Sequence, residues 1–258
     1  MVDPTPAPRL LTPSATGPRM YGDLAYLWPL VSAPEDYADE ARHWRETLRE
    51  HLGPGRHRIL ELGVGGGNNL SHLTADFDAT AVDLSEGMLA QSRRLNPGVE
   101  HHVGDMRTVR LGTRFRAVIV HDAISYLTSE DDVRATFATA RAHLEPGGIL
   151  VCAPDHYRET FGGTTVEVHG PRGPGDAFTL VEYVHDPDPA DTTVEVIYVF
   201  LLKRGGRVEV VEDRHVGGLF PLATWLRLLE EAGFTASRRP YPVHHDRRDA
   251  WLLVGKAP

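Results

Sequence analysis

The chain has 258 residues, 41% of them hydrophobic, and a formal charge of −9 at pH 7 from 27 Lys and Arg against 36 Asp and Glu. This acidic balance argues against nucleic acid as a partner, because phosphate backbones are bound by surfaces rich in lysine and arginine. Cys152 is the only cysteine, so an intrachain disulfide is excluded and a reducing, cytoplasmic location is expected. The sequence has no apolar run of about 18 residues, and we therefore expect no membrane span.

The N-terminal segment, Met1 to about Gly17, is rich in Pro, Ser, Thr and Ala, so we expect a disordered tail. The remainder, residues 18–258, is expected to form one domain. From Pro34 to Leu52, apolar residues recur at close to helical spacing behind a cluster of acidic residues. This pattern predicts an amphipathic helix ahead of the core, with the acids at its positive N-terminal end.

Short apolar runs and helical patterns then alternate along the chain. Helices are expected over Glu86 to Leu95 and Asp131 to His143, and the expected strands are Arg58 to Leu62, Ala79 to Val82, Val99 to Val103, Ala117 to Val120 and Ile149 to Ala153. Strands and helices in alternation imply right-handed crossovers. The sequence therefore predicts an α/β fold with a doubly wound, mostly parallel, Rossmann-like sheet.

After Pro154 the pattern changes to strands with period-two alternation, separated by turns rich in Pro and Gly. We expect an antiparallel β insertion, or lid, at about residues 160–217. Pro221 to Gly233 then reads as the last helix, with Gly233 at its C-terminal stop, and Trp251 to Val254 as the closing strand.

A glycine-rich turn, containing Gly63, Gly65 and Gly67, ends the first strand and opens a helix. Glycines at this position let a nucleotide-like ligand approach the backbone closely, although such a cluster alone is equally consistent with a tight turn. Asp83 ends the second strand, 20 residues after Gly63, where a carboxylate can accept hydrogen bonds from both hydroxyls of a ribose. The two features together favour a nucleoside-containing ligand.

Two further acids discriminate between nucleoside ligands. Glu61, near the end of the first strand, would repel a pyrophosphate but attract an ammonium or sulfonium group. Asp105 follows the third strand, where it can accept a hydrogen bond from an adenine amino group. A nicotinamide dinucleotide would prefer Gly-x-Gly-x-x-Gly, so a nicotinamide oxidoreductase stays open only as an alternative.

Four motifs occur in this order: Leu-Glu-Leu-Gly-x-Gly-x-Gly, Val-Asp-Leu-Ser-x-x-Met-Leu, Gly-Asp-Met and Leu-Glu-Pro-Gly-Gly. Together they resemble the motifs of class I methyltransferases that use S-adenosylmethionine, from about Tyr21 to the C-terminus. The resemblance implies a methyl-transferring enzyme and contacts to the cofactor at Glu61, Gly63, Gly65, Asp83, Leu84, Met88, Asp105 and Met106. It also implies that the backbone of His121 meets the methionine portion of the cofactor and that a polar ring near Tyr126 faces the acceptor.

A narrower resemblance is to the N,N-dimethyltransferases of dTDP-amino sugars in antibiotic biosynthesis. It is carried by Tyr21-Gly-Asp-Leu-Ala25, by the β insertion, and by Leu219-Phe220 with Trp225 after four intervening residues. This likeness implies that Tyr21 covers the cofactor, with Tyr37 as the weaker candidate. Those enzymes often have histidine where this chain has Tyr126, which leaves both the base and the acceptor open.

An amine acceptor must lose a proton before it can attack a methyl group, so a base is expected near the acceptor. His156 and His215 are candidates because imidazole titrates near neutral pH, and the resemblance adds Tyr126 as a third catalytic candidate. The histidines show no metal-ligand spacing, and we expect no metal. We expect N-methylation of a small-molecule acceptor, while O-methylation, a non-methylating cyclase or binding module, and a homodimer stay open.

Overall fold

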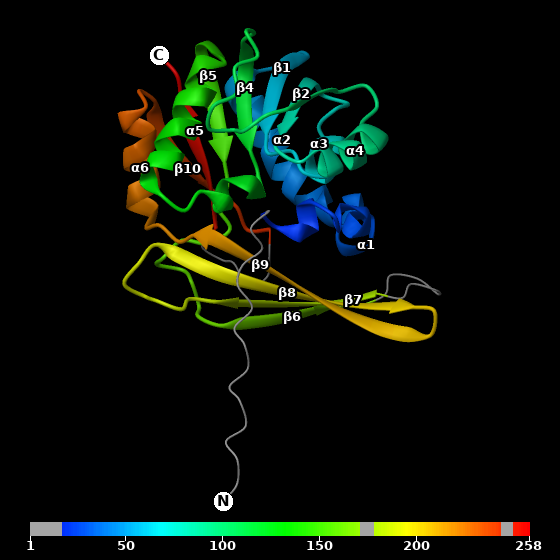
Figure 1. Ribbon diagram of the computed structural model, residues 1–258. Coiled ribbons are helices and arrows are strands. Elements are labelled where there is room, and N and C mark those ends of the chain that lie inside the picture. Colours follow the sequence, from blue (N-terminus) through cyan, green and yellow to red (C-terminus); the bar gives the residue numbers. More distant parts are fainter. Residues whose placement is uncertain (1–16, 171–177, 244–249) are drawn as a thin grey trace, which may run out of the picture.

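The computed structural model describes residues 17–170, 178–243 and 250–258. They form two sheets, one above the other in Figure 1. The larger sheet has the strand order β10-β11-β5-β4-β1-β2-β3. Its strands are β1 (His57–Leu62), β2 (Phe77–Asp83), β3 (Glu100–Val103), β4 (Phe115–Val120), β5 (Leu144–Cys152), β10 (Thr235–Pro240) and β11 (Trp251–Lys256).

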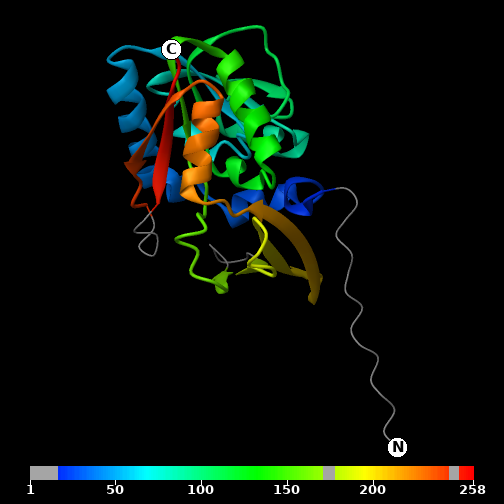
Figure 2. The same cartoon turned by 90° about the vertical axis from the view of Figure 1, so that its left-hand side faces the viewer.

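Strands β1 to β5 pair in parallel, and β11 runs antiparallel to both of its neighbours. Helices cover both faces, as Figures 1 and 2 show. The longer helices are α2 (Ala38–Leu52), α4 (Glu86–Leu95), α5 (Glu130–Ala142) and α6 (Leu222–Glu231). The predicted doubly wound, mostly parallel sheet is therefore confirmed.

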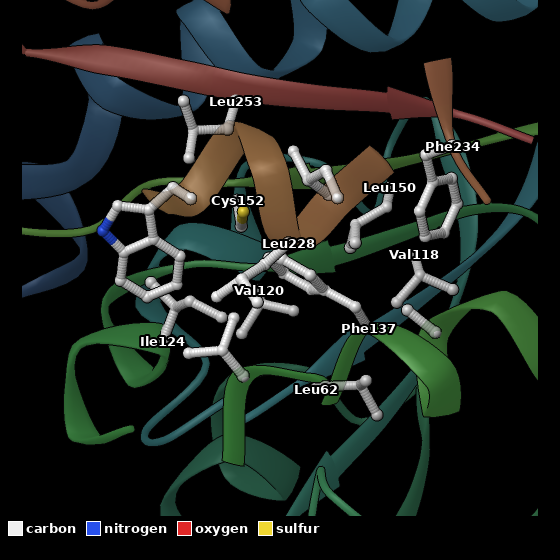
Figure 3. Close-up of a cluster of buried hydrophobic side chains, with 14 of the residues drawn as sticks. Leu62, Val118, Val120, Ile124, Phe137, Leu150, Cys152, Leu228, Phe234 and Leu253 are labelled. Atoms are coloured by element: carbon white, nitrogen blue, oxygen red, sulfur yellow. The ribbon is translucent and has the colours of Figure 1, made fainter. Parts of the chain in front are cut away.

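Alternation along the strands divides the core between the two faces of this sheet. On one face, Val118 and Val120 of β4 pack with Phe137 of α5 and Trp225 of α6, in the cluster of Figure 3. On the other, Ile119 packs with Trp44 and Leu48 of α2. Cys152 is buried in the first cluster, as a small apolar side chain would be.

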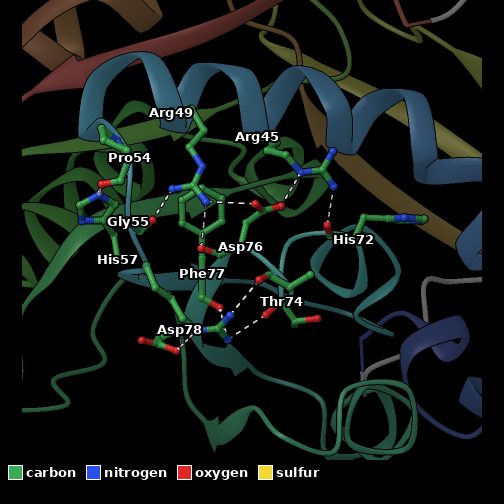
Figure 4. A network of polar contacts seen from close by, with 12 residues as sticks. Arg45, Arg49, Pro54, Gly55, His57, His72, Thr74, Asp76, Phe77 and Asp78 are labelled. Carbon is green, nitrogen blue, oxygen red and sulfur yellow. Dashed lines mark hydrogen bonds and ion pairs between the residues drawn. The ribbon is translucent and has the colours of Figure 1, made fainter.

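Arginine side chains connect α2 to the turn that precedes β2. Arg45 and Arg49 of this helix both bind the carboxylate of Asp76, at 2.8 and 3.0 Å (Figure 4). Arg56 bonds the carbonyls of Thr74 and Ala75 in the same turn. The bonds of Arg45 and Arg49 to Asp76 hold α2 in place, and this helix carries part of the site described below.

The second sheet has four antiparallel strands in sequential order: β6 (Thr165–His169), β7 (Phe178–His185), β8 (Thr193–Arg204) and β9 (Arg207–Gly218). It is the predicted β insertion, and it lies across one end of the larger sheet (Figures 1 and 2). Its inner face buries Phe178, Leu180 and Phe200 against Met20 and Leu24 from the N-terminal segment. That segment thus lies between the two sheets.

Three of the differences between the structure and the sequence-based expectations concern the N-terminal segment, an edge strand and the start of β5. The N-terminal segment forms short helices, η1 (Arg19–Tyr21), η2 (Ala25–Leu27) and α1 (Trp28–Val31), which were not expected. Strand β10 was also not expected, because Thr-Ala-Ser-Arg-Arg-Pro is a polar, largely exposed edge strand without apolar alternation. Strand β5 begins at Leu144 rather than Ile149, with a register shift against β4.

The expected disordered tail lies outside the described residues, apart from Gly17. None of the helices within the described residues combines the length and apolar character needed to cross a membrane.

Candidate active site

A cavity of about 590 Å³ lies beyond the carboxyl ends of β1, β2 and β4 and beside the turn after β3, where parallel sheets bind their ligands. We call it the strand-end cavity. All ten residues predicted to bind the cofactor line it: Tyr21, Glu61, Gly63, Gly65, Asp83, Leu84, Met88, Asp105, Met106 and His121. Tyr126 lines it as well.

The glycine-rich turn leaves β1 in a conformation that needs glycine. Gly63, Gly65 and Gly67 have φ values of +75°, +56° and +78°, which side-chain-bearing residues rarely adopt. A Cβ atom on Gly63 would also lie 2.2 Å from the Cβ of Ala123. The turn therefore brings bare backbone to the cavity wall.

Asp83 ties this turn to the end of β2. Its carboxylate accepts hydrogen bonds from the backbone N–H groups of Gly65, at 2.7 Å, and Ser85, at 2.8 Å. Burial raises the pKa of Asp83 above its ordinary value, and these two bonds oppose the rise. The carboxylate is held at the cavity wall with lone pairs left for a ligand.

Glu61 is the least satisfied acid in the cavity wall. It is 2% exposed, and its Oε2 atom has no hydrogen-bond partner among the described residues. Burial raises its pKa to about 8, although the nearby His121 lowers it. Trp28 Nε1 and both amide atoms of Asn69 also line this cavity without a partner in the described structure. Because unpaired buried polar atoms are costly, the cavity fits a polar ligand that carries a cation.

Asp105 is held by a residue that the sequence pattern did not point to. The Arg107 side chain bonds both carboxylate oxygens, at 3.0 and 2.7 Å, and its backbone N–H adds a third bond. These hydrogen bonds lower the pKa of Asp105. Both residues line the cavity, so a ligand there meets an ion pair rather than a lone carboxylate.

His121 lies between two carboxylates. Its Nε2 atom is 2.8 Å from Glu40 Oε2, and its Nδ1 atom is 3.1 Å from Asp122 Oδ1. Burial alone would lower the pKa of His121, but the two acids together raise it well above its ordinary value. These three side chains meet the spacing of a metal site. The carboxylates contact opposite ring nitrogens, however, which is the arrangement of a clamped imidazolium, and the expectation of no metal stays a prediction.

A second cavity, of about 540 Å³, lies between the larger sheet and the insertion. We call it the intersheet cavity. It shares Tyr21, Trp28, Tyr37, Asp122 and Tyr126 with the strand-end cavity, so the two meet at this wall. Carboxylates from several elements line it: Asp36, Glu40, Asp122, Asp155 and Glu182. No Lys or Arg is among its described lining residues, and the cavity is therefore suited to a cationic ligand.

A chain of hydrogen bonds begins at the shared wall. Tyr21 Oη lies 2.7 Å from Tyr126 Oη, which lies 2.6 Å from His215 Nδ1. His215 Nε2 lies 2.8 Å from Asp213 Oδ2. The structure thus brings two predicted catalytic residues, Tyr126 and His215, into contact.

His156, the third predicted catalytic residue, lies elsewhere. Its ring packs edge-on against Phe161 at 5.4 Å, and it lines neither of the two described cavities. The sequence-based prediction missed Asp213, although its position two residues before His215 on a strand places both side chains on one face. It also missed Glu40 and Glu182, for which the sequence carries no local signal.

Comparisons with known proteins agree with this geometry. A family model described as Methyltransferase domain matches residues 59–148. The dTDP-3-amino-3,4,6-trideoxy-alpha-D-glucopyranose N,N-dimethyltransferase of Streptomyces venezuelae is 33% identical over 217 residues, covering 83% of this chain and 86% of that protein. The dTDP-3-amino-3,6-dideoxy-alpha-D-glucopyranose N,N-dimethyltransferase of Streptomyces fradiae is 30% identical, covering 85% and 86%.

Two solved structures have the same fold over most of their length. A sugar N-methyltransferase from a Streptoalloteichus species is 26% identical with a TM-score of 0.78, covering 100% of this chain and 98% of that one. An amino pentose methyltransferase from Micromonospora echinaspora, solved with S-adenosylmethionine bound, is 25% identical with a TM-score of 0.73, covering 86% and 92%. The resemblance drawn from the motifs is confirmed, in favour of methyltransferases over nicotinamide oxidoreductases. On the evidence of its motifs, its strand-end cavity and these relatives, the chain belongs to the S-adenosylmethionine-dependent methyltransferases.

Proposed function

We propose that this methyltransferase methylates the amine of an amino sugar bound in the intersheet cavity. The observation that carries the proposal is the lining of that cavity, in which five carboxylates stand without a Lys or Arg among the described residues. An amine arrives largely as a cation and is attracted by such a wall. The two relatives reported above are named for dTDP-amino sugars, which agrees with this charge.

In this proposal the strand-end cavity binds S-adenosylmethionine. This cofactor supplies the methyl group, which it carries on a sulfonium. Glu61 accepts a hydrogen bond from the ammonium group, and Asp83 accepts from the ribose hydroxyls. The orphaned Oε2 atom of Glu61 and the positive-φ glycines support this assignment. The remaining proposed contacts are Tyr21, Gly63, Gly65, Leu84, Met88, Asp105, Met106 and the backbone of His121.

Nitrogen is favoured over oxygen as the acceptor atom by the groups at the shared wall. A hydroxyl acceptor needs a strong base, whereas a neutral amine already carries the attacking lone pair. Burial raises the pKa values of Tyr21 and Tyr126 well above their ordinary range, so neither ring is an anion at neutral pH. O-methylation therefore lacks a strong base at this wall.

The test compares two acceptors that differ only in having an amine or a hydroxyl at one position. Purified enzyme is given S-adenosylmethionine and either a dTDP-amino sugar or the same nucleotide sugar with a hydroxyl in place of the amine. We expect S-adenosylhomocysteine and methylated product with the amine alone. Comparable methylation of the hydroxyl sugar would contradict the nitrogen assignment, and binding without S-adenosylhomocysteine formation would favour a non-methylating module. The cytoplasmic location, the homodimer and the absence of nucleic-acid and membrane partners stay predictions.

A further inference from the structure

Four polar side chains form a continuous path from the shared wall into the insertion sheet. Tyr21 ends η1, Tyr126 ends η4 (Asp122–Tyr126), and His215 and Asp213 lie on β9. Successive polar atoms along the path are 2.7, 2.6 and 2.8 Å apart. The two tyrosines line both cavities, whereas His215 and Asp213 are 2% and 4% exposed. The path thus has one end at the reaction centre and the other inside the protein.

The ionisation of Asp213 gives this path a direction. Burial raises the pKa of Asp213, but hydrogen bonds from His215 and from two backbone N–H groups outweigh burial and hold it below its ordinary value. The ionised carboxylate only accepts hydrogen bonds, so His215 carries its proton on Nε2 and leaves Nδ1 as an acceptor. Tyr126 then donates to Nδ1 and accepts from Tyr21.

Asp213 also positions the first member of the path. Its two carboxylate oxygens accept from the backbone N–H groups of Arg19, at 3.0 Å, and Met20, at 2.6 Å. Those residues directly precede Tyr21 in η1. One side chain therefore orients the imidazole and anchors the segment that carries Tyr21.

We infer that this path carries the proton released by the acceptor amine from the shared wall to His215. The inference rests on the proposed function. An N–H proton of the ammonium passes to Tyr21 Oη as the Tyr21 proton passes to Tyr126 Oη and the Tyr126 proton passes to His215 Nδ1. Both tyrosines end neutral, and His215 ends as an imidazolium beside the Asp213 carboxylate. The freed nitrogen lone pair forms the new N–C bond as the C–S bond breaks and its electron pair stays on sulfur.

The two kinds of residue have different roles in this path. Tyr21 contacts the acceptor and is catalytic, whereas His215 and Asp213 act through the tyrosines. The charged and titratable groups that face His215 come from each element packed against it: Tyr21 of η1, Tyr126 of η4, Tyr198 of β8 and Asp213 of β9. Asp213 is the one carboxylate bonded to this ring among the described residues, so it is the group that stabilises the imidazolium.

The first test is Tyr126→Phe, which removes the middle hydroxyl and keeps the ring. kcat/KM for the amino sugar is measured from pH 7 to 9.5, together with the Kd for S-adenosylhomocysteine. We expect a loss of about tenfold at pH 7, because only about one-tenth of an amine with a pKa of about 8 is then neutral. The ratio of wild-type to variant kcat/KM should approach one above about pH 9, because an amine with a pKa of about 8 is then bound in its neutral form.

Asp213→Asn is the second test and does not depend on the tyrosine. Where the amide turns its NH2 group toward His215 and donates to Nε2, the proton of His215 moves to Nδ1, which then donates to Tyr126 and reverses the path. We expect kcat at pH 7 to fall while KM for the acceptor changes little, and the deficit again to shrink with rising pH. Tyr183→Phe, on the half-exposed part of β7, is the matched control and should leave the pH profile unchanged.

The outcomes separate the two proposals. A wild type that leaves the amine unmethylated overturns the proposed function and the proton path with it. A wild type that methylates the amine, with variant-to-wild-type ratios that do not change with pH, overturns the proton path alone. If Tyr126→Phe no longer binds S-adenosylhomocysteine, the pH profile of Asp213→Asn decides.

Discussion

The two cavities are built in different ways. The strand-end cavity takes most of its polar groups from the turns that follow four neighbouring strands, and backbone atoms of the glycine turn form part of its wall. The intersheet cavity takes its carboxylates from η3 (Pro34–Tyr37), α2, η4, the loop after β5 and strand β7 of the insertion sheet. One site is formed by the architecture of the sheet, the other by side chains that only the tertiary structure brings together. The carboxylates of the intersheet cavity can therefore change by substitution while the turns that line the strand-end cavity stay intact.

The two cavities are not fully separate, because they share one wall. Tyr21 and Tyr126 line both cavities, and Tyr21 belongs to a segment whose backbone is bonded by the insertion sheet through Asp213. The insertion therefore holds one wall of the strand-end cavity, although none of the described residues that line this cavity belongs to the insertion. Substitutions away from this wall should affect one ligand, and substitutions in it should affect both.

Glu61→Gln should give the largest effect and should act on the cofactor alone. Truncating one partner of a buried, hydrogen-bonded charge pair costs about 2–4 kcal/mol, or about 30- to 1000-fold in Kd. Glu61 is buried, lines the strand-end cavity and is absent from the described lining of the other. Calorimetric titration with S-adenosylhomocysteine measures the loss.

Glu86→Gln, an exposed glutamate at the start of α4, is the control for that experiment. It should bind the cofactor product as the wild type does. If Glu61→Gln leaves the Kd unchanged but raises KM for the acceptor, the assignment of the two cavities is reversed.

Asp83→Ala comes next, with a cost of about 1.5–3 kcal/mol in cofactor binding, the scale for hydrogen bonds to a charged group. The substitution also releases the N–H groups of Gly65 and Ser85, which loosens the glycine turn. Asp78→Ala, at the exposed start of the same strand, is the control. A Kd equal to that of the wild type would refute the ribose role of Asp83.

These two residues also illustrate what the sequence could and could not predict. Glu61 and Asp83 were found because parallel strands place their carboxyl ends at one edge, so motifs at strand ends converge. Glu40 was not found, because its contact with His121 joins residues 81 apart in the chain. Contacts of that range follow from packing, which no local pattern encodes.

The same reasoning explains the other differences. His156 follows a strand of the parallel sheet, as a site residue would, but its ring packs on Phe161 instead of facing a cavity. Strand β10 was missed because an exposed edge strand carries polar residues on both faces. The lining of the strand-end cavity was thus predictable from periodicity and motifs, and most of the lining of the intersheet cavity was not.

The pH dependence of cofactor binding is set by Glu61. Its pKa is raised to about 8 in the free protein, so below pH 8 the group is mostly protonated and must lose its proton to pair with an ammonium. Affinity should therefore increase with pH by up to about tenfold per unit between pH 6 and 8, where one unit is about 1.4 kcal/mol. Titrations in buffers of different ionisation enthalpy should detect proton release, and Glu61→Gln should abolish it.

Folding stability of the cofactor-free protein should change in the opposite sense over the same interval. The carboxyl of Glu61 holds its proton more tightly in the folded state than in the unfolded chain, where its pKa is about 4.3. The folded protein therefore binds more protons between pH 4.3 and 8, and this group lowers stability as pH rises through that window. The ionised form of Glu61 that strengthens cofactor binding at pH 8 is therefore also the form that lowers the folding stability of the cofactor-free protein.

Glu182→Gln should give the smallest effect, and it should act on the acceptor alone. Glu182 lines the intersheet cavity and its side chain is 27% exposed, so solvent screens its attraction for a cationic amine. A cost of about 0.5–1 kcal/mol corresponds to a two- to fivefold increase in KM for the amino sugar, with kcat and the Kd for S-adenosylhomocysteine unchanged. Glu209→Gln, exposed on β9 of the same sheet, controls for the loss of one negative charge. Raising the salt concentration should reduce the difference between Glu182→Gln and the wild type, because the interaction is electrostatic. An equal increase in KM for both variants would attribute the effect to net charge and would exclude a direct role of Glu182 in acceptor recognition.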